Sequence, residues 1–285
     1  MSMQFGIFGI NNGLLADPGV ASRAVKAAES AGFESVWTGE HIVLPDPQVP
    51  PSPSPPHVAF ADTSTWLAFL AGQCETLKLG TGIIILPQRN PVELAKELAT
   101  VDVASQGRLL FGLGAGYLEP EFRAMGIRFD DRGARTDEYI DAIKALWTQK
   151  NPTFAGETVR FDGIDAHPRP VQDPHPPVHV GGHSTPAFRR AVRRGNGWYG
   201  FFVDHERGAA YMKELADIEA KEGRDASLGT LECSVTPLPG ATLEDALRFR
   251  DLGIDRLTLI PDTRDEDRLM RWIDETATSM LQKVS

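Results

Sequence analysis

The sequence predicts a single (β/α)8 barrel, and three observations support this prediction. Short apolar runs alternate with amphipathic segments along the chain, which is typical of parallel strands joined by helices. Eight such units can be counted in 285 residues, and α/β barrels of about 250 residues commonly form one domain. The motifs of open, doubly wound nucleotide-binding sheets are absent. We therefore expect one domain over residues 1–285.

The expected strands are apolar, β-branched runs bounded by turn residues, as in strands buried on both faces. The third run contains Gly82, and a glycine inside a strand often marks a bend or a close approach to the backbone. In chain order, the predicted strands are residues 4–10, 34–38, 77–86, 108–113, 178–180, 197–203, 230–236 and 256–260.

The expected helices show apolar residues at helical spacing together with start and stop signals. Asp17 is a suitable N-cap before Pro18, and Gly32 ends the same helix. In chain order, the predicted helices are residues 18–31, 63–75, 91–105, 135–148, 185–194, 206–222, 243–252 and 264–281, with one short helical turn in 119–129.

Two long segments interrupt this regular alternation. One is the connection after the second strand, which contains the proline-rich loop 45–56. The other is an insertion over residues 151–177 that is rich in Pro, Gly and Asp. Residues 153–161 could form a hairpin around Gly156. Long ordered loops are often functional, so we expect both segments to cover the active site.

Composition narrows the class of partner. The net charge of −10 and the isoelectric point near 5.2 argue against binding to nucleic acid or anionic membranes. Cys74 and Cys233 are expected to be free thiols in a reducing compartment. Neither a membrane-length apolar run nor a signal-peptide pattern is found. We expect a cytoplasmic protein that acts on a small molecule.

Active sites of this fold lie at the carboxyl ends of the strands. Glycines follow or end two neighbouring strands there, at Gly82 and at Gly114 and Gly116. This pattern favours a flat ligand lying across the strand ends, although two loosely built strand–loop junctions would show it too.

Glu40 and His41 follow the second strand and form the best chemical candidate. A histidine can donate or accept a proton near neutral pH. Neighbouring residues at a strand end point to opposite sides, so the two side chains need not pair. The alternative is that His41 only caps a loop.

The segment Gly181-Gly182-His183-Ser184 leads directly into a helix. Exposed backbone N–H groups and the positive end of a helix suit a phosphate group, and barrels often hold phosphate late in the chain at a helix start. The alternative is a capped helix start without a ligand.

Other kinds of site are less well supported. His175, His179 and His183 have a spacing of four, but Pro176-Pro177 and Gly181-Gly182 forbid the helix that a metal site would need, so we expect no metal. No serine-hydrolase elbow is present. A glycosidase-like hydrolase stays open, since carboxylates follow several strands, namely Glu40, Glu119, Glu121, Asp204 and Asp262.

Several of these stretches together resemble the luciferase-like monooxygenase family over nearly the whole chain. The resemblance is carried by Leu79-Gly80-Thr81-Gly82, by Arg89-Asn90-Pro91, by the run from Thr100 to Tyr117 with Ser105, Gly107, Arg108, Gly112, Gly114 and Gly116, by Glu121-Phe122, Gly126, Arg132 and Arg135, and by Gly181-Gly182 with Ser184 and Gly195-Asn196-Gly197-Trp198.

This resemblance implies a barrel that binds the deazaflavin coenzyme F420 or FMN. Glu40-His41 is similar to the acidic–histidine element of F420-dependent members, in which one of the two faces the reactive edge of the flavin. Those members have a non-proline cis peptide after the third strand, which corresponds to Gly82-Ile83. The resemblance assigns cofactor binding to Gly82, Ile83, Gly114, Gly116, Tyr117, Gly181, Gly182, His183, Ser184 and Trp198.

One departure bears on the substrate. Some deazaflavin-dependent sugar-phosphate dehydrogenases of this family have a glutamate after the glycine-rich fourth strand, where this chain has Tyr117. Lysines that would hold a sugar phosphate are not apparent, so we do not expect that substrate class.

The resemblance leads us to expect an F420-dependent oxidoreductase that transfers a hydride to or from a small organic substrate, with His41 and Glu40 as catalytic residues. The first alternative is an FMN-dependent monooxygenase supplied by a separate reductase. A cofactor-free hydrolase and a barrel that only sequesters coenzyme are further alternatives. Family analogy favours a homodimer.

Overall fold

The computed structural model describes residues 3–284, so residues 1, 2 and 285 of the predicted domain lie outside it. Eight parallel strands form a closed barrel, as predicted, in the order β1, β2, β3, β5, β8, β9, β10 and β11, and β11 pairs with β1. The short strand β4 follows β3 and also pairs with β5. The strands are β1 Gln4–Phe8, β2 Ser35–Thr38, β3 Lys78–Thr81, β4 Ile84–Ile85, β5 Leu109–Gly114, β8 Val178–Gly181, β9 Gly197–Val203, β10 Glu232–Pro237 and β11 Arg256–Leu259.

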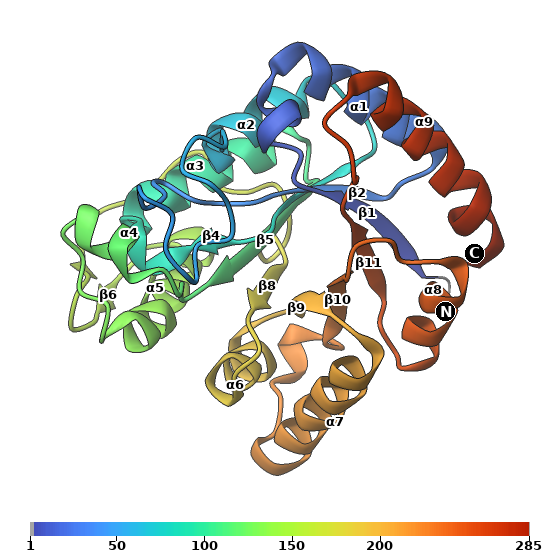
Figure 1. The fold of residues 1–285 in the computed structure, drawn as a ribbon. Helices are drawn as coiled ribbons and strands as arrows, with labels where there is room; N and C mark the ends of the chain where they lie inside the picture. The colour runs from blue at the N-terminus through green and yellow to red at the C-terminus, as the bar shows by residue number, and fades with distance from the viewer. Residues whose placement is uncertain (1–2, 285) are drawn as a thin grey trace.

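Helices surround the strands on the outside of the barrel (Figure 1). Most begin at a side-chain N-cap, such as Asp17 before α1 or Asn90 before α3. The α-helices are α1 Pro18–Ala31, α2 Thr63–Ala71, α3 Pro91–Ala104, α4 Glu119–Ala124, α5 Arg132–Thr148, α6 Thr185–Arg194, α7 His205–Glu222, α8 Leu243–Asp251, α9 Glu266–Thr276 and α10 Gln282–Val284. Short 3₁₀ segments lie at Gly13–Ala16, Leu86–Gln88 and Ala226–Leu228, and Ala277–Leu281 is a π-helix.

The structure refines two predicted elements. The third predicted strand, residues 77–86, is divided into β3 and β4 by the Gly82-Ile83 peptide bond, which is cis as expected. The predicted hairpin around Gly156 is present as the antiparallel pair β6 Phe154–Ala155 and β7 Arg160–Phe161.

The insertion 151–177 differs from the prediction that it covers the active site. Glu138 of α5 accepts hydrogen bonds from the backbone of residues 157–159. Asp102, near the end of α3, accepts from the backbone of Val171 and Gln172, and the Gln172 amide donates to the carbonyl of Leu109, the first residue of β5. The reason is topological, because a connection from a helix to the next strand lies at the amino ends of the strands.

Large side chains pack against glycines inside the barrel. The Trp37 ring is fully buried and stacks on the Tyr199 ring at a centroid distance of 5.4 Å. A Cβ atom at Gly80 would lie 2.3 Å from Trp37, and one at Gly6 would lie 3.0 Å from its Nε1 atom. Glycine at these positions leaves the space that the indole ring occupies, so the barrel is filled by side chains and is not a pore.

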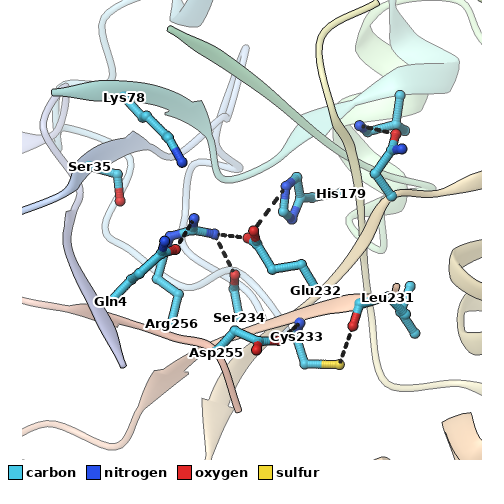
Figure 2. Close-up of polar contacts among 12 residues, drawn as sticks. Gln4, Ser35, Lys78, His179, Leu231, Glu232, Cys233, Ser234, Asp255 and Arg256 are labelled. Carbon is cyan, nitrogen blue, oxygen red and sulfur yellow. Dashed lines mark hydrogen bonds and ion pairs between the residues drawn. The ribbon is translucent and has the colours of Figure 1, made fainter. Parts of the chain in front are cut away.

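A buried charged cluster closes the amino end of the barrel (Figure 2). The Arg256 side chain is fully buried and donates hydrogen bonds to Glu34, Glu232, Ser234 and Gln4. Because a buried guanidinium without partners is very unfavourable, these acceptors fix the first residues of several strands around one side chain.

His179 lies beside this cluster, and its Nε2 atom is 3.8 Å from a Glu232 oxygen (Figure 2). Burial lowers the pKa of His179 to about 4. Burial alone would raise the pKa of Glu34, but the charges and hydrogen bonds of Arg256 and Lys78 together outweigh it and lower that pKa to about 2. Both groups bind fewer protons in the folded than in the unfolded chain at acidic pH, so folding stability falls as the pH falls.

We predict that His179→Gln reduces the acid sensitivity of folding between pH 6.5 and pH 4. In the wild type, the unfolded histidine takes up a proton in this range while the buried ring stays neutral. A pKa difference of this size corresponds to about 3 kcal/mol. Urea unfolding at pH 7 and pH 4.5 measures it, with the exposed His57→Gln as control. An equal loss of stability in all three proteins would contradict the prediction.

Candidate active site

Apolar side chains gather at the carboxyl ends of the strands, although solvent reaches them. Most of the exposed large hydrophobic residues of the described chain lie in strand–helix connections or at a strand end there, namely Ile42, Val43, Val49, Tyr117, Phe202 and Leu238. The end of the proline-rich connection packs on the first loop, since the Ala61 N–H donates to the Asn11 carbonyl. An apolar mouth of this kind suits a flat organic ring.

The Ile83 side chain projects into the barrel mouth from the cis peptide and occupies space left by two glycines. A Cβ atom at Gly114 would lie 2.6 Å from Ile83 Cδ1, and one at Gly181 would lie 2.9 Å from Ile83 Cγ2. The glycines that end β5 and β8 therefore make room for Ile83, which remains partly exposed. Gly82 itself has little space, because a Cβ atom there would lie 2.9 Å from the Thr38 carbonyl oxygen.

Glu40 holds this segment in place from the end of β2. One carboxylate oxygen accepts a hydrogen bond from the backbone N–H of Ile85, and the other accepts from the Arg89 guanidinium. Arg89 also bonds to Asp62, the N-cap of α2, at 2.8 Å. Burial raises the pKa of Glu40, while the Arg89 charge opposes that effect.

His41 follows Glu40, but it faces a different carboxylate. Its Nδ1 atom lies 3.5 Å from an oxygen of Glu121, and the His41 side chain is 9% exposed. The Phe60 and Tyr117 rings meet the imidazole edge-on at 5.3 and 6.2 Å. Partial desolvation of the phenol by neighbouring protein atoms and the Glu121 charge raise the pKa of Tyr117, so its phenol stays protonated at neutral pH.

The loop after β8 is held by its aromatic neighbours. The Trp198 indole is fully buried outside the strands, and its N–H donates to the Gly182 carbonyl at 2.9 Å. His183 Nε2 accepts a hydrogen bond from the Phe201 N–H at 3.0 Å, and its ring stacks on Tyr211. Partial desolvation of the stacked ring and the Arg207 charge lower the pKa of His183, which suits this accepting role.

The helix that begins after this loop lacks the usual cap. Ser184 is the N-cap residue of α6, yet its side chain accepts no hydrogen bond from the first turn. Asp17, Asp62 and Asp204 do accept such bonds at their own helices. Residues 182–186 are exposed. Pro186, the second residue of α6, has no N–H, so the N–H groups of Thr185 and Ala187 are the ones left for an anion at this helix start.

The structure brings together part of the predicted site. Gly82, Ile83, Gly114, Gly116 and Tyr117 lie at or beyond the carboxyl ends of β3 and β5, with His41 at the end of β2. Gly181, Gly182, His183 and Ser184 form the loop after β8.

Two predicted site residues have other contacts. Glu40 does not pair with His41, because Arg89 and the Ile85 N–H take up its carboxylate. Trp198 points outward from the barrel and packs on Phe188, so its side chain supports the loop and is too deeply buried to line the mouth.

The contact between Glu121 and His41 was not predicted from the sequence. Glu121 lies on the short helix α4, far from His41 in the chain, and was noticed only within a family-like stretch and among possible hydrolase carboxylates. Its full burial, with 1% of its surface exposed, is the signal that only the structure supplies.

Comparisons with known proteins place the chain in a family. The family model described as luciferase-like monooxygenase matches residues 3–282. The chain belongs to the luciferase-like monooxygenase family. Membership of this family makes the protein a luciferase-like oxidoreductase, as the resemblance implied.

Several known proteins are similar to this chain in sequence or in fold. An uncharacterised protein of Mycobacterium tuberculosis is 29% identical over 266 residues, covering 90% of this chain and 92% of its own. The FMNH2-dependent dimethylsulfone monooxygenase of Pseudomonas putida is 36% identical over 155 residues, covering 53% of this chain and 42% of its own. An F420-dependent secondary alcohol dehydrogenase, solved with an F420–acetone adduct, superposes with a TM-score of 0.80 at 17% identity, covering 98% of both chains.

We predict that Glu40→Gln lowers the free energy of unfolding by about 2 kcal/mol, because it removes the charged acceptor of the hydrogen bonds from Arg89, which keeps its bond to Asp62. Denaturant unfolding measures this effect. Glu97→Gln, an exposed change within α3, is the control and should be near neutral. Equal stability of the Glu40 variant and the wild type would show that Glu40 does not hold the segment after the cis peptide.

Proposed function

We propose that this protein is an F420-dependent oxidoreductase that transfers a hydride between the deazaflavin and a small organic substrate. The observation that carries the proposal is His41, a proton-exchanging side chain set among aromatic rings on a strand end adjacent to the Gly82-Ile83 bend. No amino-acid side chain transfers a hydride, so a redox cofactor must supply that chemistry.

The residues present fit such a cofactor in two ways. The partly exposed Ile83 and the apolar residues of the surrounding loops offer a surface for a flat tricyclic ring. The uncapped start of α6 offers N–H groups and the positive end of a helix dipole for a phosphate. Gly181, Gly182 and Ser184 would lie along the phosphate, whereas His183 and Trp198 would hold their loop through the contacts described above.

The chain's own residues then have distinct tasks. His41 polarises or protonates the substrate heteroatom. Tyr117, exposed and protonated, lies next to His41 and can line the substrate space. The proline-rich loop 45–56 follows β2, and in this proposal it excludes water from the mouth. Glu40 acts through the backbone that it holds and not as an acid or base.

The second candidate is an FMN-dependent monooxygenase. A specific observation favours it, since the P. putida relative at 36% identity is FMNH2-dependent by name. A flavin-dependent trigonelline monooxygenase of Acinetobacter baylyi, 32% identical over 170 residues, is named as an oxygenase component. In that case a separate reductase would supply reduced flavin to this chain. In either case we propose a homodimer by family analogy, which light scattering would test.

A hydrolase that uses strand-end carboxylates has less support. Glu40 is committed to Arg89, and Asp204 is the N-cap of α7, where it accepts a hydrogen bond from the Arg207 N–H. Failure of the protein to bind either F420 or FMN would favour the hydrolase or another cofactor-free reaction. Tight binding without turnover of any substrate would favour a coenzyme-sequestering barrel.

We predict that the purified protein binds F420 with a dissociation constant in the micromolar range or below, and more tightly than FMN. Fluorescence and absorbance titrations with each coenzyme measure this. Tighter binding of FMN would replace the first candidate with the monooxygenase, and binding of neither would overturn both.

We predict opposite effects of Ser184→Asp on stability and on coenzyme binding. Aspartate is a good N-cap and should stabilise α6 by about 0.5–1 kcal/mol, while its charge should repel the phosphate and weaken binding at least tenfold. Thermal unfolding and the same titrations measure the two effects, with Ser30→Asp, at an exposed position in the last turn of α1, as the control for added charge on coenzyme binding. Unchanged affinity would mean that the phosphate does not lie at this helix.

A further inference from the structure

We infer that Glu121 is a positioning residue that fixes the tautomer of His41, so that His41 exchanges its proton with the substrate through Nε2. The inference rests on the proposed function for its chemical meaning, but its structural part concerns two side chains of this protein alone. The carboxylate that acts on the histidine is therefore Glu121 and not its sequence neighbour Glu40.

Glu121 is fully buried, and one of its two carboxylate oxygens accepts two backbone hydrogen bonds. The Oε1 atom accepts hydrogen bonds from the backbone N–H groups of Ile42 at 2.6 Å and Val43 at 3.3 Å. These are the two residues that follow His41, so Glu121 is hydrogen-bonded to the backbone directly after the histidine. The contact fixes the orientation of the carboxylate relative to the imidazole ring.

The other half of the carboxylate has one suitable partner. The Oε2 atom of Glu121 and the Nδ1 atom of His41 are both buried, both lack a hydrogen bond, and lie 3.5 Å apart. Two buried polar atoms left unpaired would each cost free energy. Catalytic hydrogen bonds are often long in proteins without ligand and shorten when the site is filled. A small rotation of the His41 ring would bring these two atoms within hydrogen-bond distance.

The chemistry of the pair then decides the tautomer. A carboxylate can only accept a hydrogen bond, so the His41 nitrogen facing it must carry the proton. With the proton on Nδ1, the neutral ring keeps its lone pair on Nε2. The exposed 9% of the His41 side chain excludes the buried Nδ1 atom, so the remaining ring atoms provide the contact with the mouth.

Proton and electron balance follow from this arrangement. A bound deazaflavin or flavin would supply the two-electron acceptor for the carbon-bound hydride of a substrate alcohol, and His41 Nε2 would take up its hydroxyl proton. The resulting imidazolium carries protons on both nitrogens and is stabilised by the Glu121 charge. In the reducing direction the same Nε2 proton returns to the carbonyl oxygen as the hydride arrives at carbon.

The test is the tautomer itself, read from long-range 1H–15N spectra of histidine-labelled protein without coenzyme. The chain has seven histidines, and His41→Asn assigns the His41 signals. At a pH where its 15N shifts show a neutral ring, we expect His41 to carry the proton on Nδ1. In Glu121→Gln, the amide oxygen can still accept from the two backbone N–H groups, while the amide NH2 faces Nδ1. We therefore expect the His41 proton to move to Nε2.

Glu119→Gln is the matched control, because Glu119 lies on the same helix but is exposed. It should leave the His41 tautomer unchanged. Thermal unfolding checks that each variant is folded. An Nε2–H tautomer in the wild type would overturn the inference even if Glu121→Gln does not fold. An unchanged Nδ1–H tautomer in a folded Glu121→Gln protein would overturn it too, because a merely structural Glu121 would give that result.

Turnover and binding separate this inference from the proposed function. If the protein binds F420 or FMN, Glu121→Gln should lower kcat at least tenfold and leave coenzyme affinity within about twofold. If the wild-type protein binds neither coenzyme, the proposed function is refuted, but the result on the His41 tautomer is unaffected. An unchanged kcat in a folded variant would refute the catalytic part of the inference.

Discussion

The space that glycines leave to larger side chains is the constraint on which the site depends. Deep in the barrel, Gly6 and Gly80 accommodate Trp37, which stacks on Tyr199 and fills the interior. At the mouth, Gly114 and Gly181 accommodate Ile83. Interiors of proteins are close-packed, so these positions are coupled and cannot vary independently. The floor of the candidate site is therefore set by the same packing that closes the barrel.

Charge holds the two ends of the barrel in different ways. At the amino ends, Arg256 gathers Glu34 and Glu232 into a buried cluster that contributes to stability and its pH dependence. At the carboxyl ends, Glu40 fixes the backbone after the cis peptide, and Glu121 fixes the backbone after His41. Each end also has a buried histidine nitrogen without a hydrogen bond, His179 Nδ1 beside the first cluster and His41 Nδ1 beside Glu121. What makes the second pair a candidate catalytic one is its place at the carboxyl ends of the strands, where active sites of this fold lie.

Local pattern was enough to predict the barrel, because strand and helix signals alternate with clear glycine, proline and N-cap boundaries. The His41 position and the Gly82-Ile83 bend were also accessible, the second only through family resemblance. The partner of His41 was not, because Glu121 comes from another connection and only its burial distinguishes it. The insertion 151–177 was misplaced over the mouth because its composition resembles a lid, while its position after a helix decides which end it occupies. Trp198 was assigned to the cofactor from a motif, although strand alternation turns it outward.

We propose that a flat redox coenzyme lies on the Ile83 floor, with its phosphate at the start of α6 and its reactive edge toward His41. A crystal structure of the protein with bound F420, or with FMN if that binds more tightly, tests this most directly. We expect the ring to contact Ile83 and the backbone of Gly82, and the phosphate to accept hydrogen bonds around Ser184. A coenzyme bound away from the carboxyl ends of the strands, or with its phosphate far from α6, would contradict the account.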